Sequence, residues 1–271
     1  MPELPEVETT RRGILAQARG RVITAVMVRN RNLRWPVPSR LAAHLSNTRI
    51  LDIRRRGKYL IFETANGYML LHLGMSGSLR IETADRAPKK HDHVEWALDD
   101  GRLLRLHDPR RFGSVHWIEE SPEQHPLLRD LGPEPLGAGF DDGYLFRQSR
   151  RYRCSIKHFI MNSKVVVGVG NIYANEALFL AGIAPGRAAN RVSAAQYEKL
   201  TGAIKTLLQD AIRQGGTTLR DFVNPEGNPG YFRLQLQVYE QTGKPCRRCG
   251  KPIRHRVMGQ RSSYYCSGCQ K

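Results

Sequence analysis

The chain has 271 residues, and 43 Lys plus Arg against 25 Asp plus Glu give a formal net charge of +18. This length allows two domains and a sizeable core, and a hydrophobic content of 40% means that disorder is not the default. The charge predicts a polyanionic partner, either nucleic acid or an anionic membrane surface. No apolar run reaches the roughly eighteen residues of a membrane span, and the charges and prolines at the start argue against a signal peptide.

The chain opens with the segment MPELPEVE, in which a proline directly follows the initiator Met. Proline at this position favours removal of Met1, which leaves Pro2 with a free secondary amine whose pKa lies near ~8. Such an amine attacks an aldehyde-like carbon to form an iminium, which is an electron sink, and the adjacent Glu3 can trade protons with it. The same residues also suit an ordinary helix start, so both interpretations stay open on this segment alone. We expect a helix from about Pro5 to Ala18, ended by Gly20.

After this helix the pattern changes to short β-rich segments separated by turns. We expect strands at residues 22–28, 49–53, 59–62, 68–71, 78–81, 94–98, 103–106 and 115–118. Asn66-Gly67 and Asp100-Gly101 fall between neighbouring strands, as is typical of hairpin turns. Many short strands with such turns predict a sandwich or a barrel.

Beyond a linker rich in Pro, Gly and acids, at about residues 122–143, the period becomes helical. The clearest helix starts at Ser193, which forms a capping box with Gln196, and it stops at Gly215-Gly216. Residues 168–173 (GVGNIY) predict a glycine turn that enters a helix. The amides of this turn suit a phosphate, but tight helix–turn–helix packing explains the glycines equally well. A β half, a helical half and a metal module predict an α+β multi-domain protein.

Four of the five cysteines form two CxxC pairs, Cys246–Cys249 and Cys266–Cys269, with sixteen residues between the pairs. This spacing predicts one Zn²⁺ held by four thiolates, and the ion would be structural because no coordination position stays open. Two disulfides are the weaker interpretation, since the sequence carries no export signal. The fifth cysteine, Cys154, has no such partner and is expected to be a buried or bystander thiol.

The cysteine module is strongly basic. Residues 241–271 contain eight Lys or Arg and no Asp or Glu, so a zinc-bound hairpin of this charge suits a nucleic-acid contact. Further basic groups lie at residues 54–58, 91–93, 108–112 and 147–157, although any single one is more often a solvated face. Met75 falls on an expected turn, where an exposed side chain suits a wedge into a base stack, but core packing is its commoner fate.

Further motifs follow in order along the chain. They are PELPEV at residues 2–7, GKYL at 57–60, HLGMSG at 72–77, KHDH at 90–93, DPRRF at 108–112, VGVGNIYA at 167–174, QGGTT at 214–218 and RSSYYC at 261–266. Together with the four cysteines they resemble the bacterial formamidopyrimidine-DNA glycosylase (8-oxoguanine DNA glycosylase/AP lyase) family, over essentially the whole chain. The related endonuclease VIII has Gly where this chain has Leu4, and it lacks the set formed here by Met75, Arg110 and Phe112. The resemblance is therefore to the branch of the family that acts on purine lesions.

The resemblance implies a fold in three parts. Residues 1–130 would form a catalytic β-sandwich with a leading helix, residues 131–235 a helical domain with a helix-two-turn-helix, and residues 236–271 a four-cysteine zinc-finger β-hairpin. One structural Zn²⁺ would be held by Cys246, Cys249, Cys266 and Cys269, and no nucleotide cofactor would be needed.

The resemblance also implies roles for single residues. Pro2 would be the nucleophile at the anomeric carbon of the sugar, and Glu3 the acid/base that helps to open the ring. Lys58 would donate a proton and contact a phosphate, whereas Arg261 would clamp phosphates and assist the second elimination. Contacts with DNA are implied for His72, Met75, His91, Arg110, Phe112, Arg151, Lys157 and Asn171. Met75, Arg110 and Phe112 would fill the gap left by the extruded nucleotide, and the loop at residues 224–230 would cover the everted base.

The activity implied by the resemblance is that of a bifunctional enzyme of base excision repair. It would remove oxidised purines from double-stranded DNA through a Schiff base on Pro2 and cleave the abasic strand by β,δ-elimination. The enzyme would be monomeric, cytoplasmic and nucleoid-associated, with no membrane partner. A non-catalytic damage-binding zinc protein of the same fold is the alternative from another class, and a preference for oxidised pyrimidines is the alternative within this class.

Overall fold

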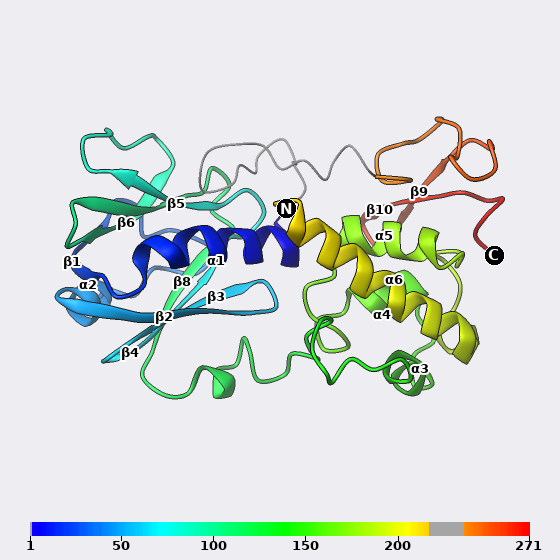
Figure 1. Cartoon of the computed structure of the whole chain (residues 1–271), viewed down its shortest axis with the longest axis horizontal. Coiled ribbons are helices and arrows are strands. Elements are labelled where there is room, and N and C mark those ends of the chain that lie inside the picture. Colours follow the sequence, from blue (N-terminus) through cyan, green and yellow to red (C-terminus); the bar gives the residue numbers. More distant parts are fainter. Residues whose placement is uncertain (1, 217–235) are drawn as a thin grey trace. The chain divides into compact units, whose positions relative to one another are not determined.

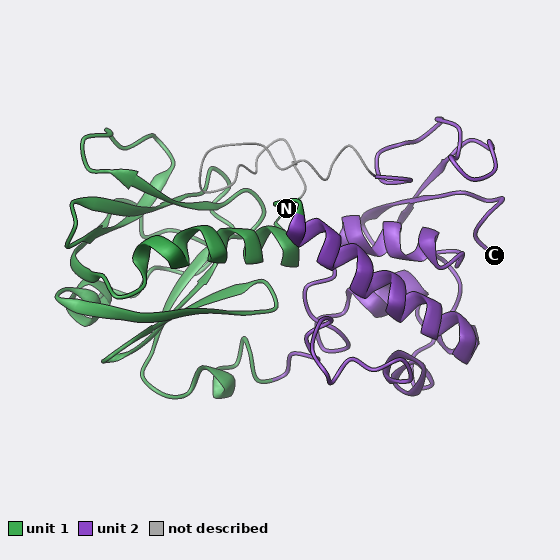
Figure 2. Ribbon diagram, in the orientation of Figure 1, with its two compact units in different colours: residues 1–129, 214–231 green, residues 130–213, 232–271 purple. Residues whose placement is uncertain are grey.

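The computed structural model describes residues 2–216 and 236–271, and the chain divides into two compact units (Figure 2). Unit 1 comprises residues 1–129 and 214–231, and unit 2 comprises residues 130–213 and 232–271. The zinc-finger segment thus belongs to the same compact unit as the helical segment, and the division of the chain into three domains stays a prediction. No helix among the described residues has the length and the apolar character needed to cross a membrane.

Unit 1 is built on eight antiparallel strands in the order β5-β7-β6-β1-β2-β3-β4-β8. They are β1 (Val22–Val28), β2 (Thr48–Arg56), β3 (Tyr59–Thr64), β4 (Gly67–His72), β5 (Ser78–Thr83), β6 (Asp92–Leu98), β7 (Arg102–His107) and β8 (Ser114–Ile118). Strands β1 and β2 pair only through Val22 with Arg49 and Ile23 with Thr48. The order therefore splits into two four-stranded layers, which confirms the expected sandwich (Figure 1).

The two layers share one hydrophobic core. Its buried members include Val94, Trp96, Leu104 and Leu106 from one layer and Ile53, Leu60, Phe62, Met69 and Val115 from the other. Helix α1 (Leu4–Ala18) runs along this sandwich and buries Leu4, Val7, Ile14 and Ala18, which recur at the spacing of one helix face. The short helix α2 (Leu41–Leu45), which sequence reasoning did not predict, buries Leu41 and Leu45 in the same core.

The turns follow the expected sequence signals. Strands β3 and β4 are joined through Asn66 and Gly67, and strands β6 and β7 through Asp100 and Gly101. Gly67 and Gly101 have φ values of 142° and 80°, which L side chains rarely adopt, so glycine suits both positions. Most strands extend one or two residues beyond their predicted ends, because pairing continues where the hydrophobic alternation has already faded.

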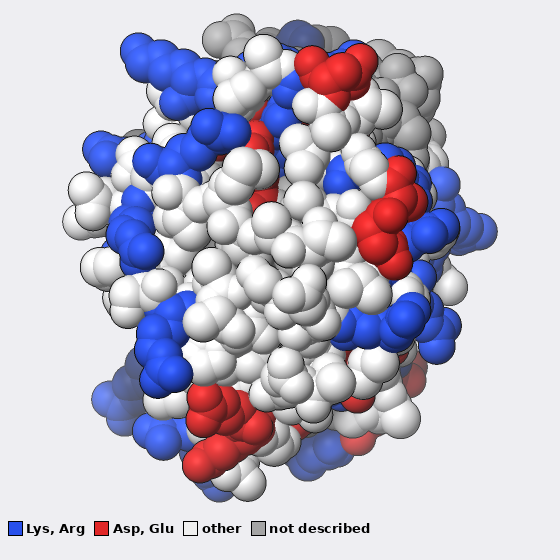
Figure 3. Space-filling model, turned by 90° about the vertical axis from the view of Figure 1, so that its left-hand side faces the viewer, with Lys and Arg blue, Asp and Glu red and all other residues white. Residues whose placement is uncertain are grey.

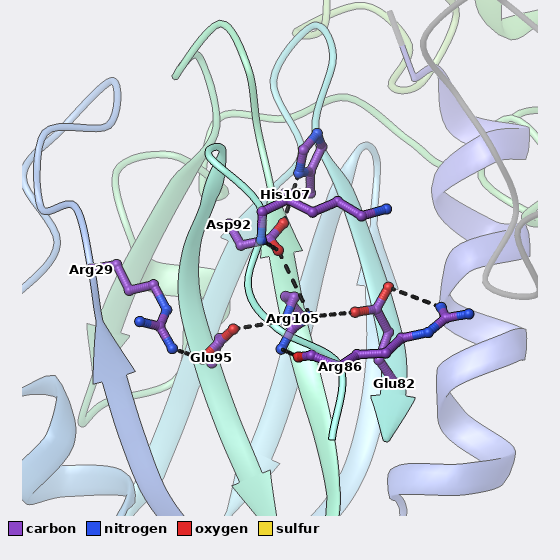
Figure 4. A network of polar contacts seen from close by, with 8 residues as sticks. Arg29, Glu82, Arg86, Asp92, Glu95, Arg105 and His107 are labelled. Atoms are coloured by element: carbon purple, nitrogen blue, oxygen red, sulfur yellow. Dashed lines mark hydrogen bonds and ion pairs between the residues drawn. The ribbon is translucent and has the colours of Figure 1, made fainter. Parts of the chain in front are cut away.

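A network of charged side chains lies on the layer formed by β5, β7 and β6 (Figure 4). The centre of this network is Arg105, whose side chain is 3% exposed. Its guanidinium donates to Glu82 at 2.5 Å and lies 2.7 Å from a Glu95 oxygen and 3.8 Å from an Asp92 oxygen. Arg29 pairs with the other Glu95 oxygen at 2.8 Å, Arg86 with Glu82 at 3.7 Å, and His107 Nδ1 with Asp92 at 2.7 Å. Three guanidinium groups thus offset three carboxylates, as buried charges require.

Unit 2 contains four α-helices and a β-hairpin among its described residues. They are α3 (Tyr144–Ser149), α4 (Ile156–Met161), α5 (Asn171–Leu180), α6 (Ala194–Arg213), β9 (Arg254–Met258) and β10 (Arg261–Tyr265). The predicted capping box opens α6, since Gln196 N–H donates to Ser193 Oγ at 3.3 Å and Ser193 N–H to Gln196 Oε1 at 3.2 Å. Gly215 and Gly216 follow its end with φ values of 78° and 84°.

One end of unit 1 carries charges of both signs. Figure 3 views the end of the sandwich at which β1 and α2 lie. Neutral residues fill the centre of this face, with separate basic and acidic groups around it. This end of unit 1 is therefore not a uniform polyanion-binding surface.

Candidate active site and nucleic-acid contacts

Pro2 and Glu3 lie directly before the first turn of α1. Both residues are buried, Glu3 with 1% exposure. Glu3 is the N-cap, and a capping box joins it to Glu6: the Glu3 side chain accepts from the Glu6 amide, and Glu3 N–H donates to Glu6 Oε2 at 2.7 Å. The partial positive charge of the helix N-terminus therefore lies beside the Pro2 nitrogen and the Glu3 carboxylate. The positive end of the helix disfavours a protonated amine at an unblocked Pro2.

Lys58 lies in the tight turn between β2 and β3, after Gly57, whose φ is 57°. Arg55 connects this turn to α1, because it donates to the Gly57 carbonyl at 2.9 Å and pairs with Glu8 at 3.1 Å. Glu8 lies on the second turn of α1 and also accepts from Arg11 at 2.8 Å. The helix that carries Pro2 and Glu3 and the turn that carries Lys58 are thus tied together by charged contacts within unit 1.

The charge of Lys58 also acts on His72. Burial, followed by the charges of Lys58 and Arg34, lowers the pKa of His72 to about 4. Its ring is therefore neutral at pH 7, and its Nδ1 accepts the Gly74 N–H at 2.9 Å. The remaining nitrogen, Nε2, then carries the proton. His72 can contact a phosphate or a sugar as a neutral hydrogen-bond donor and not as a cation.

Met75, Arg110 and Phe112 lie on two turns of unit 1, and the turn at Met75 was predicted from the sequence. Met75 is half-buried on the turn between β4 and β5, and Phe112 is 43% exposed on the turn between β7 and β8. The Arg110 guanidinium lies over the Phe112 ring, 5.0 Å from its centroid. His91 occupies a third turn, directly before β6, and its ring lies 5.9 Å from that of His107. An exposed aromatic ring under a cation is suited to contact with bases.

In unit 2, α4 holds the hairpin that carries Arg261. The Lys157 ammonium is buried and donates to the Ser262 carbonyl at 2.6 Å and to Ser263 Oγ at 2.7 Å. The next residue, His158, lies against the hairpin turn, where a Cβ on Gly259 would come within 2.1 Å of its Nε2. Arg261 is exposed between these two anchors. The DNA contact predicted for Lys157 stays a prediction, and in this structure its charge serves the hairpin.

Asn171 is the first residue of α5 and lies near the same hairpin. Its carbonyl accepts from the Asn175 side chain at 2.6 Å, and Asn175 Oδ1 accepts from the Tyr264 amide of β10 at 2.8 Å. Asn175 thereby connects the start of α5 to the strand that begins at Arg261. Arg151 is exposed on the turn after α3, where its predicted DNA contact stays untested.

The four paired cysteines gather at the base of the hairpin. The Sγ atoms of Cys246 and Cys269 are 3.8 Å apart, those of Cys249 and Cys266 are 3.4 Å apart, and all four lie within 4.8 Å of one another. Tetrahedral Zn²⁺ with bonds of about 2.3 Å places its sulfurs about 3.8 Å apart, so the cluster fits one structural zinc ion. Cys154 stands apart from the cluster and is exposed, so the expectation of a buried thiol is wrong, and the bystander alternative stays a prediction.

Three family models cover most of the chain. The formamidopyrimidine-DNA glycosylase N-terminal domain matches residues 1–115, the H2TH domain of the same enzyme residues 131–223, and the zinc finger found in FPG and IleRS residues 243–271. The chain belongs to the formamidopyrimidine-DNA glycosylase family. It is therefore a DNA glycosylase of DNA repair with a four-cysteine zinc finger.

Curated relatives and solved structures agree with this family. Formamidopyrimidine-DNA glycosylases of Thioalkalivibrio sulfidiphilus and Nitrosococcus oceani are 58% and 55% identical to this chain, with 100% of both sequences covered in each case. The Thermus thermophilus MutM (Fpg) structure aligns with a TM-score of 0.90 at 37% identity, over 99% of this chain and 98% of that one. A Lactococcus lactis Fpg variant in complex with DNA that contains Fapy-dG has a TM-score of 0.92 at 34% identity, with 100% of both chains covered.

Several contacts that join parts of the candidate site were not predicted from the sequence. Arg55, Asp108 and Asn175 each join segments far apart in the chain, and neither local periodicity nor motif spacing indicates such contacts. Asp108 belongs to the DPRRF motif, but no role was predicted for this residue from the sequence. The loop expected to cover the everted base, residues 224–230, lies outside the described residues.

Proposed function

We propose that this glycosylase excises oxidised purines, such as 8-oxoguanine and formamidopyrimidines, and then cleaves the abasic strand by β,δ-elimination. The observation that supports this most directly is the burial of Pro2 and Glu3 together at the positive end of α1. Two of the similar solved structures are, by their descriptions, complexes with Fapy-dG and carbocyclic 8-oxo-G DNA. We infer the substrate class of this chain from the burial of Pro2 and Glu3 together with these two complexes.

The reaction begins with attack of the unblocked Pro2 nitrogen on C1′ of the extruded nucleotide. The bond from C1′ to the base breaks, the base leaves with the proton of the amine, and the Pro2 nitrogen is joined to C1′ by a single bond. The C1′–O4′ bond then breaks as O4′ takes up a proton, and the nitrogen lone pair forms the iminium with C1′. Glu3 exchanges the proton that opens the sugar ring, and Lys58 supplies a proton near the reacting groups. The helix N-terminus at Pro2 supports this step because it disfavours protonation of the attacking amine.

The iminium then drives strand cleavage. It withdraws electrons from the sugar, so a C2′ proton leaves and the 3′ phosphate departs with the electrons of its C–O bond. A second elimination releases the 5′ phosphate, and Arg261 assists it by holding that anion. The products are a free base, a sugar fragment and a one-nucleotide gap with phosphate on both sides.

Borohydride trapping tests the covalent step. Reduction of the iminium on a duplex that contains 8-oxoguanine is expected to give a stable protein–DNA adduct through Pro2, and Pro2→Gly is expected to slow strand cleavage. Glu3→Gln should lower base release while the protein still binds the duplex. Intact-mass measurement of the sample must show that Met1 is absent, since a peptide bond would block the Pro2 nitrogen.

The alternative functions predict other results. A non-catalytic damage-binding protein would bind the duplex tightly and give no adduct even with Met1 removed. A preference for oxidised pyrimidines would appear as faster cleavage of a thymine-glycol duplex when it competes with the 8-oxoguanine duplex. Either outcome would overturn the corresponding part of the proposal.

A further inference from the structure

Asp108 lies at the centre of three turns that carry the predicted DNA contacts of unit 1. Its carboxylate is 0% exposed. One oxygen accepts from Ser76 Oγ at 3.1 Å, in the turn that contains Met75, and the other accepts from Gly113 N–H at 2.7 Å, at the end of the turn that contains Phe112. A single buried side chain therefore joins two turns that lie more than thirty residues apart in the sequence.

The backbone of Asp108 holds the third turn. Its N–H donates to the carbonyl of His91 at 2.9 Å. Its own carbonyl accepts from His93 Nε2 at 2.9 Å, and His93 is only 4% exposed. The turn that carries His91 is also held by Asp92, whose Oδ2 accepts the Lys89 N–H at 2.6 Å. Asp92 is itself part of the charged network around Arg105 (Figure 4).

The packing around Asp108 leaves no room for adjustment. A Cβ on Gly113 would lie 2.9 Å from Asp108 Oδ2, and a Cβ on Gly74 would lie 2.4 Å from the Gly113 nitrogen. The Met75 turn and the Phe112 turn thus touch through their backbones. Loss of the carboxylate would leave the buried Gly113 N–H without an acceptor and would remove the bond that fixes this contact.

We propose that Asp108 is a positioning residue, which aligns Met75, His91, Arg110 and Phe112 as one rigid wedge that opens the base stack. This inference rests on the proposed function, in which the lesion leaves the duplex before Pro2 attacks it. Three connections between strands must deliver side chains to one gap, and small displacements of such groups cost a large part of the rate. A carboxylate suits this position because both of its oxygens accept hydrogen bonds.

The test compares two duplexes under single-turnover conditions, one with 8-oxoguanine and one with a preformed abasic site. Extrusion is cheapest where no base is stacked, so a wedge defect should slow the first substrate far more than the second. We expect Asp108→Ala to lower the rate on 8-oxoguanine by about 30-fold or more and the rate on the abasic site by less than about 3-fold. A 2-aminopurine next to the lesion should show slower opening of the stack.

Three further variants isolate the contact. Ser76→Ala removes one of the two bonds and should lower the 8-oxoguanine rate by about 3- to 10-fold, even if Asp108→Ala fails to fold. Asp108→Asn can still accept from Gly113 N–H and can donate to Ser76 Oγ, so it should restore most of the rate. Ser114→Ala is the matched control, because the buried Ser114 hydroxyl next to Gly113 has no hydrogen-bond partner; it should leave both rates unchanged.

Hydrogen exchange of the free protein gives a readout that does not depend on activity. Amides of residues 74–77, 89–93 and 108–113 should exchange faster in Asp108→Ala than in the parent protein. Equal rate losses on both duplexes, or unchanged exchange and unchanged rates, would overturn the positioning role. If the parent protein cleaves neither duplex, the proposed function fails, and the exchange data still decide whether Asp108 holds the three turns.

Discussion

At the scale of single residues, buried charges connect the site to the sandwich. Glu8 is 7% exposed on α1 and contacts three guanidinium groups, those of Arg11, Arg12 and Arg55. Burial alone would raise the pKa of Glu8, but the hydrogen bonds from Arg11 and Arg12 and the charges of Arg11 and Arg55 outweigh it and lower the pKa to about 2. Because Arg55 also holds the Gly57 carbonyl, the Glu8 carboxylate stabilises the turn on which Lys58 lies.

The lowered pKa of Glu8 predicts a pH-dependent contribution to stability. The unfolded chain binds a proton at Glu8 near pH 4.5 and the folded chain only near pH 2, so the stabilisation is fully present above about 4.5 and is lost as the pH falls through about 2. Glu8→Gln should therefore lower the free energy of unfolding by about 1–3 kcal/mol at pH 7, allowing for partial solvent screening. Urea denaturation of both proteins at pH 7, 4 and 3 measures the difference.

The control for Glu8 is Glu120→Gln, which changes an exposed acid in the same unit. It should leave the free energy of unfolding nearly unchanged at each pH. A Glu8→Gln difference that stays constant from pH 7 to 3 would show that the Arg contacts do not set the pKa of Glu8.

At the scale of secondary-structure elements, the β9–β10 hairpin depends on its two-residue turn. Gly259 and Gln260 have φ values of 53° and 60°, which correspond to the type I′ turn that matches the twist of antiparallel strands. The turn also packs on His158, while Lys157 donates to the strand after it. Arg261 follows the turn directly, so its position is set by the turn and by α4 together.

Gly259→Ala tests this dependence. A side chain at this φ is strained, and its Cβ would overlap His158, so we expect a loss of about 1–3 kcal/mol of hairpin stability. Faster hydrogen exchange of residues 254–265 and weaker DNA binding should accompany the loss. Gly243→Ala is the matched control, since Gly243 has a φ of 80° and no atom within 4 Å of its Cβ position. If both variants behave alike, backbone strain and not the His158 contact determines the effect.

At the scale of the whole molecule, the proposed site residues are distributed over both units. Unit 1 contains Pro2, Glu3 and Lys58, together with the turns that carry Met75, His91, Arg110 and Phe112. Unit 2 contains Arg261 and the cysteine cluster. The basic surplus of +18 favours binding to a polyanion, and the face drawn in Figure 3 carries both basic and acidic groups around a neutral centre. Residues 241–271 of the finger contribute eight Lys or Arg without an acid, so its folding should control DNA affinity.

Removal of the metal tests that contribution. Cys249→Ala breaks the four-sulfur cluster, and zinc content should fall from one ion per chain to nearly none. DNA affinity at fixed salt should fall about tenfold or more, while the sandwich keeps its own unfolding transition. Cys154→Ala, an exposed cysteine outside the cluster, should retain both zinc and affinity. Normal DNA affinity in a zinc-free Cys249→Ala protein would contradict the role assigned to the finger.

The sequence by itself determined most features that depend on local pattern. Short β-rich segments separated by turns predicted the eight strands of the sandwich, Ser193 and Gln196 predicted the start of α6, and the CxxC spacing predicted the metal cluster. The motifs predicted the family, because they occur together and in order along the chain. Helix α2 was not predicted, because a segment of five residues is too short to show helical periodicity.

Only the tertiary structure decided which distant residues support the site. Arg55 reaches Glu8 across 47 positions, Lys157 reaches Ser262 across 105, and Asp108 reaches Ser76 across 32. Buried polar groups must find partners wherever the folded chain brings them, and sequence spacing does not encode that proximity. Short motifs in the sequence therefore predict the chemistry, whereas the contacts that align those motifs form only when strands and helices pack.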